Sequence, residues 1–336
     1  MDPNFLQPSK QVSVLMVPFP LQGHLNQLLH LSRLISAHNV TVHYVGTATH
    51  NRQAQRRIHG WDPRSSNNII FHEFPSLQFE SPPPNPNTPI QFPSHLQPLF
   101  DATSFLRHPV GRLMRNLSAA NRRVIIIHDS LMGSVVQDFV KFPNAESYTF
   151  HSVSAYTMFF FLWESMRRPF AIDEEILDNL PSMEGCFTPE FLKFVSNQHG
   201  YMNLNSGRIY NTCRVVEGPF LELLSKPQIS GEKKQWALGP FNPVITEKNK
   251  ILSSDSSLRH KCLKWLDGLT QNSVIFVSFG TTTTLLKKQI NELAIGLEKS
   301  EQRKRAAELG GSVRKAVAEG GATRLEFDSF ISHITR

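Results

Sequence analysis

Two polar side chains follow predicted buried strands, and their types could support acid–base chemistry. His24 comes shortly after the apolar run Val12–Val17, and Asp129 comes directly after the run Val124–Ile127 and one further histidine. Ligands of open parallel sheets bind at the carboxyl ends of the strands, so both positions are candidates for a site. An imidazole can exchange a proton near neutral pH. A histidine that caps the following helix or faces solvent is the alternative.

The segments that must position these two side chains alternate between apolar strands and helices. After His24, leucine and isoleucine residues recur at helical spacing as far as Ile35. Further strands are predicted at Val40–Val45, Ile69–Phe74, Ser147–Phe150 and Arg208–Tyr210. Strands that are apolar throughout and separated by helices indicate a parallel sheet covered on both faces. The predicted fold class is therefore α/β.

The last third of the chain gives a weaker pattern. Residues 226–257 are rich in Pro, Gly, Ser and Lys, which is typical of a linker between domains. A buried strand is predicted at Ser273–Phe279, and a helix containing Ile290 follows. No second strand run appears after it, although a single strand cannot form a sheet. We therefore expect a second α/β domain that is incomplete.

Composition and charge exclude several classes of protein. The net charge of +7 is distributed over short basic doublets, whereas nucleic-acid binders gather such charge on one face or arm. The cysteines Cys186, Cys213 and Cys262 lie far apart and form no CxxC pair, so neither a metal site nor a disulfide framework is indicated. No secretory signal or membrane-length apolar run is present. We expect a cytoplasmic chain without metal, nucleic-acid or membrane partners.

Several motifs, in a fixed order, resemble those of the plant UDP-dependent glycosyltransferases. They are Pro18–His24, Ile127–Asp129, Trp236–Pro240, Cys262–Asp267 and Val277–Thr281. Within that family, three stretches are similar to the zeatin O-glucosyl- and O-xylosyltransferases, namely His43–Asn51, Ser81–Asn87 and Asn144–Ser152. The resemblance runs from about residue 10 to 300 and resumes from about Arg305 to Arg336.

This resemblance implies two facing doubly wound, Rossmann-like domains, the GT-B arrangement, with the second domain truncated. The implied parts are an acceptor-binding domain at 1–225, the linker at 226–257, a truncated donor-binding domain at 258–320, and a helix at 321–336 that packs back on the first domain. The family's signature segment for uracil, ribose, diphosphate and sugar is missing, because Glu298–Arg303 joins regions that are distant in relatives. A splice product or a faulty gene model would look the same.

The resemblance also assigns catalytic roles and donor-binding roles to individual residues. His24 would be the general base that takes a proton from the acceptor hydroxyl, and Asp129 would orient it and stabilise the imidazolium. The reaction would invert the anomeric centre, with a UDP-sugar as co-substrate and no cofactor or metal. Gly23, Gly280 and Thr281 would contact the donor through backbone N–H and hydroxyl groups. A turn glycine and an ordinary helix N-cap are the alternatives.

The implied acceptor is a zeatin-like cytokinin. The proline-rich loop 75–98 and the aromatic helix 153–163 would bind it, with His151, Phe160 and Trp163 as pocket candidates. Core packing is the alternative, and the better one for most of the aromatic side chains. Two functions stay open. In the first, the chain transfers a hexose or pentose to a cytokinin hydroxyl, with an activity that is impaired in this shortened form. In the second, the chain is a non-catalytic product that binds the acceptor or is misfolded. We expect a monomer.

Overall fold

A computed structural model of the chain describes residues 9–58, 61–75, 78–83, 94–178, 180, 182, 184–242, 261–270, 273–278, 287–298 and 302–336. The chain divides into two compact units. The first comprises residues 1–242 and 311–336, and the second comprises residues 243–310.

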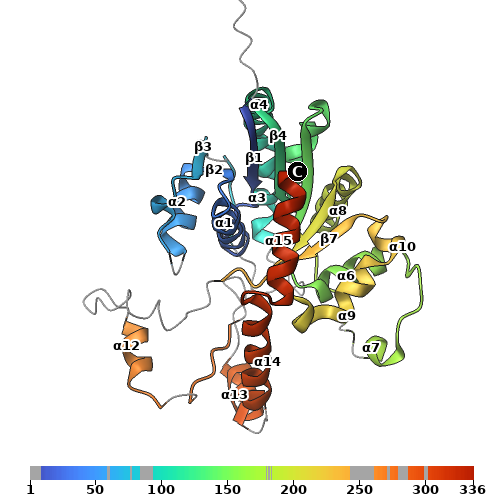
Figure 1. The fold of residues 1–336 in the computed structure, drawn as a ribbon. Coiled ribbons are helices and arrows are strands. Elements are labelled where there is room, and N and C mark those ends of the chain that lie inside the picture. Colours follow the sequence, from blue (N-terminus) through green and yellow to red (C-terminus); the bar gives the residue numbers. More distant parts are fainter. Residues whose placement is uncertain are drawn as a thin grey trace, which may run out of the picture. The chain divides into compact units, whose positions relative to one another are not determined.

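The first unit contains a seven-stranded sheet in which every neighbouring pair is parallel, in the order β3-β2-β1-β4-β5-β6-β7 (Figure 1). The strands are β1 (Ser9–Val17), β2 (Thr41–Thr47), β3 (Ile69–Phe74), β4 (Asn121–Asp129), β5 (Ala145–His151), β6 (Gly207–Tyr210) and β7 (Lys234–Ala237). The direction in which strands are added reverses between β1 and β4. Open α/β sheets bind ligands at such a switch point, outside the carboxyl ends of the strands. The α/β prediction with a parallel sheet is confirmed.

Helices connect the strands and cover the sheet. They are α1 (Gln22–Ser36), α2 (Ala48–Arg57), α3 (Gln97–Ala102), α4 (Arg107–Ala120), α5 (Gly133–Val136), α6 (Ala155–Ser165), α7 (Glu174–Asp178), α8 (Pro189–Gly200), α9 (Arg214–Ser225), α10 (Pro227–Ser230) and α15 (Ala322–Thr335). Short 3-10 segments are η1 (Pro63–Ser65), η2 (Ser94–Leu96), η3 (Thr103–Leu106), η4 (Gln137–Lys141) and η5 (Tyr201–Leu204).

Alternation along the strands directs their side chains into cores on opposite faces of the sheet. In β4, Ile125 and Ile127 join one core with α1 and α15, which lie side by side in Figure 1. Val124 and Ile126 join the core on the other face, which is closed by α4 and α5. A third core, built on α6, α9 and α10, contains Tyr210 from the end of β6.

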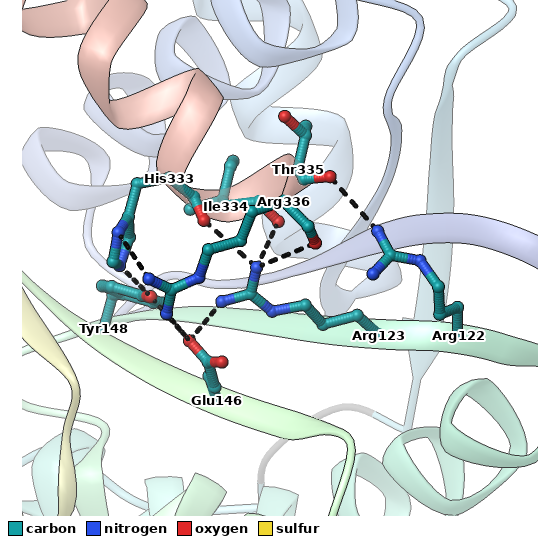
Figure 2. Close-up of polar contacts among 8 residues, drawn as sticks. All are labelled: Arg122, Arg123, Glu146, Tyr148, His333, Ile334, Thr335 and Arg336. Atoms are coloured by element: carbon teal, nitrogen blue, oxygen red, sulfur yellow. Dashed lines mark hydrogen bonds and ion pairs between the residues drawn. The ribbon is translucent and has the colours of Figure 1, made fainter.

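The C-terminal helix α15 is attached to the sheet at both ends. Near its beginning, Glu326 accepts a 2.8 Å hydrogen bond from the backbone N–H of Ala237 and pairs with Arg214. At its end, Arg123 of β4 donates to the carbonyl oxygens of His333 and Ile334 at 3.1 Å (Figure 2). A helix leaves its last carbonyl groups without intrahelical partners, and here a side chain of β4 satisfies them.

The stretch predicted as a linker at 226–257 begins with ordered structure. Helix α10 and strand β7 lie within it, and Trp236 of β7 is buried in the core beside α15. The first unit therefore continues to Asn242. The proline and glycine content of this stretch predicts a linker and gives no sign of the four-residue edge strand β7. That strand forms because it pairs with β6, which depends on the rest of the sheet.

The described residues of the second unit form helices but no strand. The helices are α12 (Lys261–Asp267), α13 (Lys287–Glu298) and the first part of α14 (Gln302–Val317), which continues into the first unit. The strand prediction at Ser273–Phe279 is wrong for Ser273–Ser278, which has no strand assignment, and Phe276 there is 88 % exposed. An isolated apolar segment has no neighbour to satisfy its backbone groups, so propensity alone does not make a strand. No helix in the described part of the chain is both long and apolar enough to cross a bilayer.

Candidate functional site

His24 lies in the first turn of α1, just beyond the carboxyl end of β1. Pro18 and Pro20 interrupt the strand, and Leu21 keeps an extended backbone (φ −116°, ψ 147°) before the helix begins. The His24 N–H then bonds to the Leu21 carbonyl oxygen at 2.9 Å. Its side chain is 19 % exposed, so the imidazole is both held and reachable from solvent.

Asp129 is the last residue of β4, the strand next to β1 across the switch point. Its carboxylate is completely buried, and Oδ2 lies 2.7 Å from Nδ1 of His24. The other oxygen, Oδ1, accepts the backbone N–H of Leu131 at 2.9 Å. The structure therefore brings together the two residues that sequence analysis selected first.

The proton arrangement at His24 follows from its partner. A carboxylate only accepts hydrogen bonds, so Nδ1 carries the proton and Nε2 of the neutral ring is left unprotonated. No described residue forms a hydrogen bond with Nε2. The ring of Phe19 packs 5.2 Å from the imidazole, centroid to centroid, and restricts its rotation further. This arrangement can accept a proton at Nε2 while the buried carboxylate stabilises the imidazolium.

A third group contacts His24 that sequence analysis did not select. Ser152, just after β5, places its Oγ 2.9 Å from Nδ1. Sequence analysis selected the preceding residue, His151, although both lie at the carboxyl end of a strand. The pleat sends successive side chains to opposite sides, so a change of one position separates a buried histidine from a hydroxyl in the site.

His151, Phe160 and Trp163 lie in the interior of the first unit. His151 is completely buried and stacks on Tyr210 with 5.0 Å between the ring centroids. Burial, with lesser contributions from Arg208 and other histidines, lowers the pKa of His151 well below its ordinary value, so the ring is neutral. Phe160 and Trp163 are 6 % and 2 % exposed in the core of α6 and α9. Their contact with an acceptor remains a prediction.

The predicted donor-side residues are only partly described. Gly23 is exposed, and a Cβ placed on it would meet nothing within 4 Å, so the space beside His24 is open. Gly280 and Thr281 lie outside the described residues. Within the described part of the chain, no group of three or more His, Cys, Asp or Glu side chains is placed to hold a metal ion.

Comparison with known proteins assigns the family. Residues 10–243 match the family model described as "Glycosyltransferase, N-terminal domain". The chain belongs to this glycosyltransferase family. It is 50 % identical to zeatin O-glucosyltransferase of Phaseolus lunatus over 293 residues, and 47 % identical to zeatin O-xylosyltransferase of Phaseolus vulgaris over 298 residues. The matched regions cover 87 % and 89 % of this chain.

The same regions cover 61 % and 63 % of those two glycosyltransferases, so the chain spans about three fifths of their length. Among solved structures, LpCGTa in complex with UDP aligns with a TM-score of 0.60 at 22 % identity, covering 87 % of this chain and 65 % of that one. The family resemblance and the GT-B fold class predicted from the sequence are confirmed.

Proposed function

We propose that this chain is a UDP-glycosyltransferase that inverts the anomeric centre and transfers a hexose or pentose from a UDP-sugar to the hydroxyl of a zeatin-like cytokinin. Identity of 47–50 % to relatives named for O-glucosyl and O-xylosyl transfer to zeatin supports the substrate class. The UDP complex of a structural neighbour supports the donor class. As a co-substrate, the UDP-sugar requires no resident cofactor.

The pair formed by His24 and Asp129 is the observation that carries the proposal. The acceptor hydroxyl gives its proton to Nε2 of His24 as its oxygen attacks the anomeric carbon. The bond from that carbon to the UDP oxygen breaks, and UDP leaves with the electron pair. Asp129, 2.7 Å from Nδ1 and fully buried, stabilises the positive ring that results. Attack opposite the leaving group inverts the configuration.

We further propose that donor binding is the weaker half of this chain. The chain spans about three fifths of its relatives, and the described residues of 243–310 form no strand. Each lost charge-assisted hydrogen bond to a donor costs about 1.5–3 kcal/mol, so the loss of a few lowers donor affinity by several orders of magnitude. The proposed domain roles are therefore acceptor binding by the first unit and residual donor contact by the second.

The first prediction concerns glycoside formation. The purified chain, incubated at high concentration with zeatin and radiolabelled UDP-glucose or UDP-xylose, is expected to form zeatin O-glycoside slowly. His24→Ala should lower that rate by about 100-fold or more, because the general base is removed. His108→Ala, an exposed histidine on α4, is the matched control and should leave the rate unchanged. Absence of product, or equal product from His24→Ala, contradicts the proposed transfer.

Acceptor binding without turnover is the second candidate function. The segment Ser273–Ser278 in the second unit has no strand assignment, which favours this function, because a donor domain needs a sheet to place its ligand contacts. Calorimetric titration separates the two functions. A chain that binds zeatin and shows no heat with UDP fits the second function, and a chain that retains UDP tightly contradicts it.

A further inference from the structure

We propose that Gln27, Ser152 and Asn211 are positioning residues for His24, connected to it by a series of hydrogen bonds that begins at a backbone N–H and includes the Ser152 backbone. The contribution of these residues to catalysis rests on the proposed function. Their effect on the orientation of the His24 imidazole does not depend on that function.

The chain of hydrogen bonds starts beyond β7. The Phe241 N–H donates to Oδ1 of Asn211 at 3.0 Å, and Nδ2 of Asn211 donates to Oε1 of Gln27 at 2.9 Å. Nε2 of Gln27 then donates to the Ser152 carbonyl oxygen at 3.0 Å. The Ser152 hydroxyl completes the connection 2.9 Å from Nδ1 of His24.

The two ends of this chain determine the orientation of both amides. The Phe241 N–H can only donate, so it requires the oxygen of Asn211. The Ser152 carbonyl can only accept, so it requires the NH₂ group of Gln27. Turning either amide over would place oxygen against oxygen or hydrogen against hydrogen. Only one orientation of the two amides therefore satisfies all these donors and acceptors. A positioning role requires such a single orientation.

The four segments involved converge on the carboxyl edge of the sheet. Gln27 lies one helical turn after His24 in α1, Ser152 follows β5, Asn211 follows β6, and Phe241 follows β7. A Cβ at Gly239 would overlap the Asn211 side chain and backbone, so this approach is as close as a glycine allows. The chain thus links His24 to strands that are far from it in sequence.

The Ser152 hydroxyl gives the Nδ1–H of His24 a second acceptor beside Asp129. A ring held by two acceptors and by the packing of Phe19 has less freedom to rotate than a ring held by one. Gln27 acts on this geometry only through the Ser152 backbone. Misplacement of a catalytic group by about 1 Å can cost about 100-fold in rate, so even a small displacement is measurable.

The test is NMR of histidine-labelled protein, which follows the Nδ1–H proton of His24 without requiring turnover. His24→Ala identifies the resonance. Asn211→Asp keeps the acceptor for Phe241 but cannot donate to Gln27. Gln27 must then turn its NH₂ toward residue 211 and present oxygen to Ser152. We expect solvent exchange of the Nδ1–H to accelerate about five- to tenfold, the effect of losing one net hydrogen bond.

Three further variants and a matched control test the same hydrogen bonds. Gln27→Met retains length without hydrogen bonds and should accelerate exchange similarly. Ser152→Ala should do so as well, whereas Ser152→Thr, which keeps the hydroxyl, should exchange like wild type. Gln137→Glu is the matched control, because Gln137 also donates an amide to a backbone carbonyl, that of Ser134, away from His24. It should leave exchange unchanged.

Kinetics supply a second readout where glycoside forms. The three disruptive variants should lower kcat about tenfold with little change in KM for the acceptor, because they move the base and not the acceptor contacts. Exchange at wild-type rates in variants that keep the wild-type circular dichroism spectrum overturns the inference. If the chain forms no glycoside, the proposed function is contradicted. The NMR exchange rates still decide whether Gln27, Ser152 and Asn211 position His24.

Discussion

Two buried histidines on the same face of the sheet differ in how their ring nitrogens are satisfied. His128 of β4 bonds to the Asp129 carbonyl through Nδ1 at 2.8 Å and approaches Thr149 Oγ1 through Nε2 at 3.2 Å. Both ring nitrogens of His151 lack a hydrogen-bond partner among the described residues. Burial is the main cause that lowers the pKa of each, to about 4 for His128, so both rings are neutral at pH 7.

Replacing each ring by phenylalanine separates hydrogen bonding from packing. His128→Phe and His151→Phe add similar volume to the same core, so the cost of overpacking is comparable. Only His128→Phe removes hydrogen bonds: the Thr149 hydroxyl still accepts from Nδ2 of Asn205, but its own proton loses the Nε2 acceptor of His128. We expect His128→Phe to lower the free energy of unfolding by about 1–3 kcal/mol more than His151→Phe at pH 7.5. Urea unfolding measures both. Equal losses would contradict the assigned hydrogen bonds.

Sequence alone could place a polar residue at a site where that residue follows one visible strand, and the catalytic roles of such residues stay predictions. His24 and Asp129 could be selected because each lies at a strand end and both strands were visible as apolar runs. Ser152, Gln27 and Asn211 could not, because their contacts depend on the lateral order of β5, β6 and β7. The sequence position of a polar residue after a strand does not indicate which helix side chain will contact it.

At the scale of elements, the end of α15 depends on one arginine of β4. Arg123 is 7 % exposed and donates to the carbonyl groups of His333 and Ile334, while its other Nη pairs with Glu146 (Figure 2). Burial acts to raise the pKa of Glu146, but hydrogen bonds from Arg123 and Tyr148 outweigh it and the pKa is lowered. Glu146 is therefore ionised at neutral pH. The neighbouring Arg122, from an exposed position, donates to the Thr335 carbonyl and to no other side chain or carbonyl in the described ranges.

These two adjacent arginines form a matched pair of tests. Arg123→Ala leaves helix carbonyls and Glu146 without their main partner, and we expect it to lower the free energy of unfolding by about 2–4 kcal/mol. Arg122→Ala should cost about 0.5 kcal/mol or less, as exposed pairs do. Thermal or urea unfolding gives the comparison, and amide hydrogen exchange in α15 should rise only for Arg123→Ala. Similar losses for the two variants would show that this contact does not anchor the helix.

The prediction of strands was wrong where pairing with a neighbouring strand, and not the strand propensity of the residues, determines whether a strand forms. Strand β7 has four residues beside a proline and glycine segment, and it exists because β6 offers an open edge. The run at Ser273–Ser278 has stronger strand propensity but has no strand assignment. Both errors come from the same physical fact, that a strand is stabilised by its neighbours.

At the scale of the whole molecule, several buried or half-buried histidines make stability depend on pH. Burial is the main cause that lowers the pKa of His43, His128 and His199 to about 4, and it also lowers the pKa of His151 well below its ordinary value. The ordinary value is near 6.5. The unfolded chain therefore binds more protons than the folded chain at any pH between these values. Stability is complete above pH 6.5 and is lost as the pH falls toward 4.

The size of this loss sets the last prediction. Each such histidine costs at most about 1.4 kcal/mol per pH unit below 6.5, so four of them lower the free energy of unfolding by about 3–5 kcal/mol between pH 7.5 and 5.5. This is a large fraction of the stability of an ordinary domain. Urea unfolding followed by circular dichroism at the two pH values measures it. His151→Phe should recover about 1 kcal/mol of the loss, because one titrating group is gone, whereas exposed His108→Ala should recover none. A pH-independent midpoint would mean that these rings are protonated in the folded chain, and the neutral interior described for them would then be incorrect.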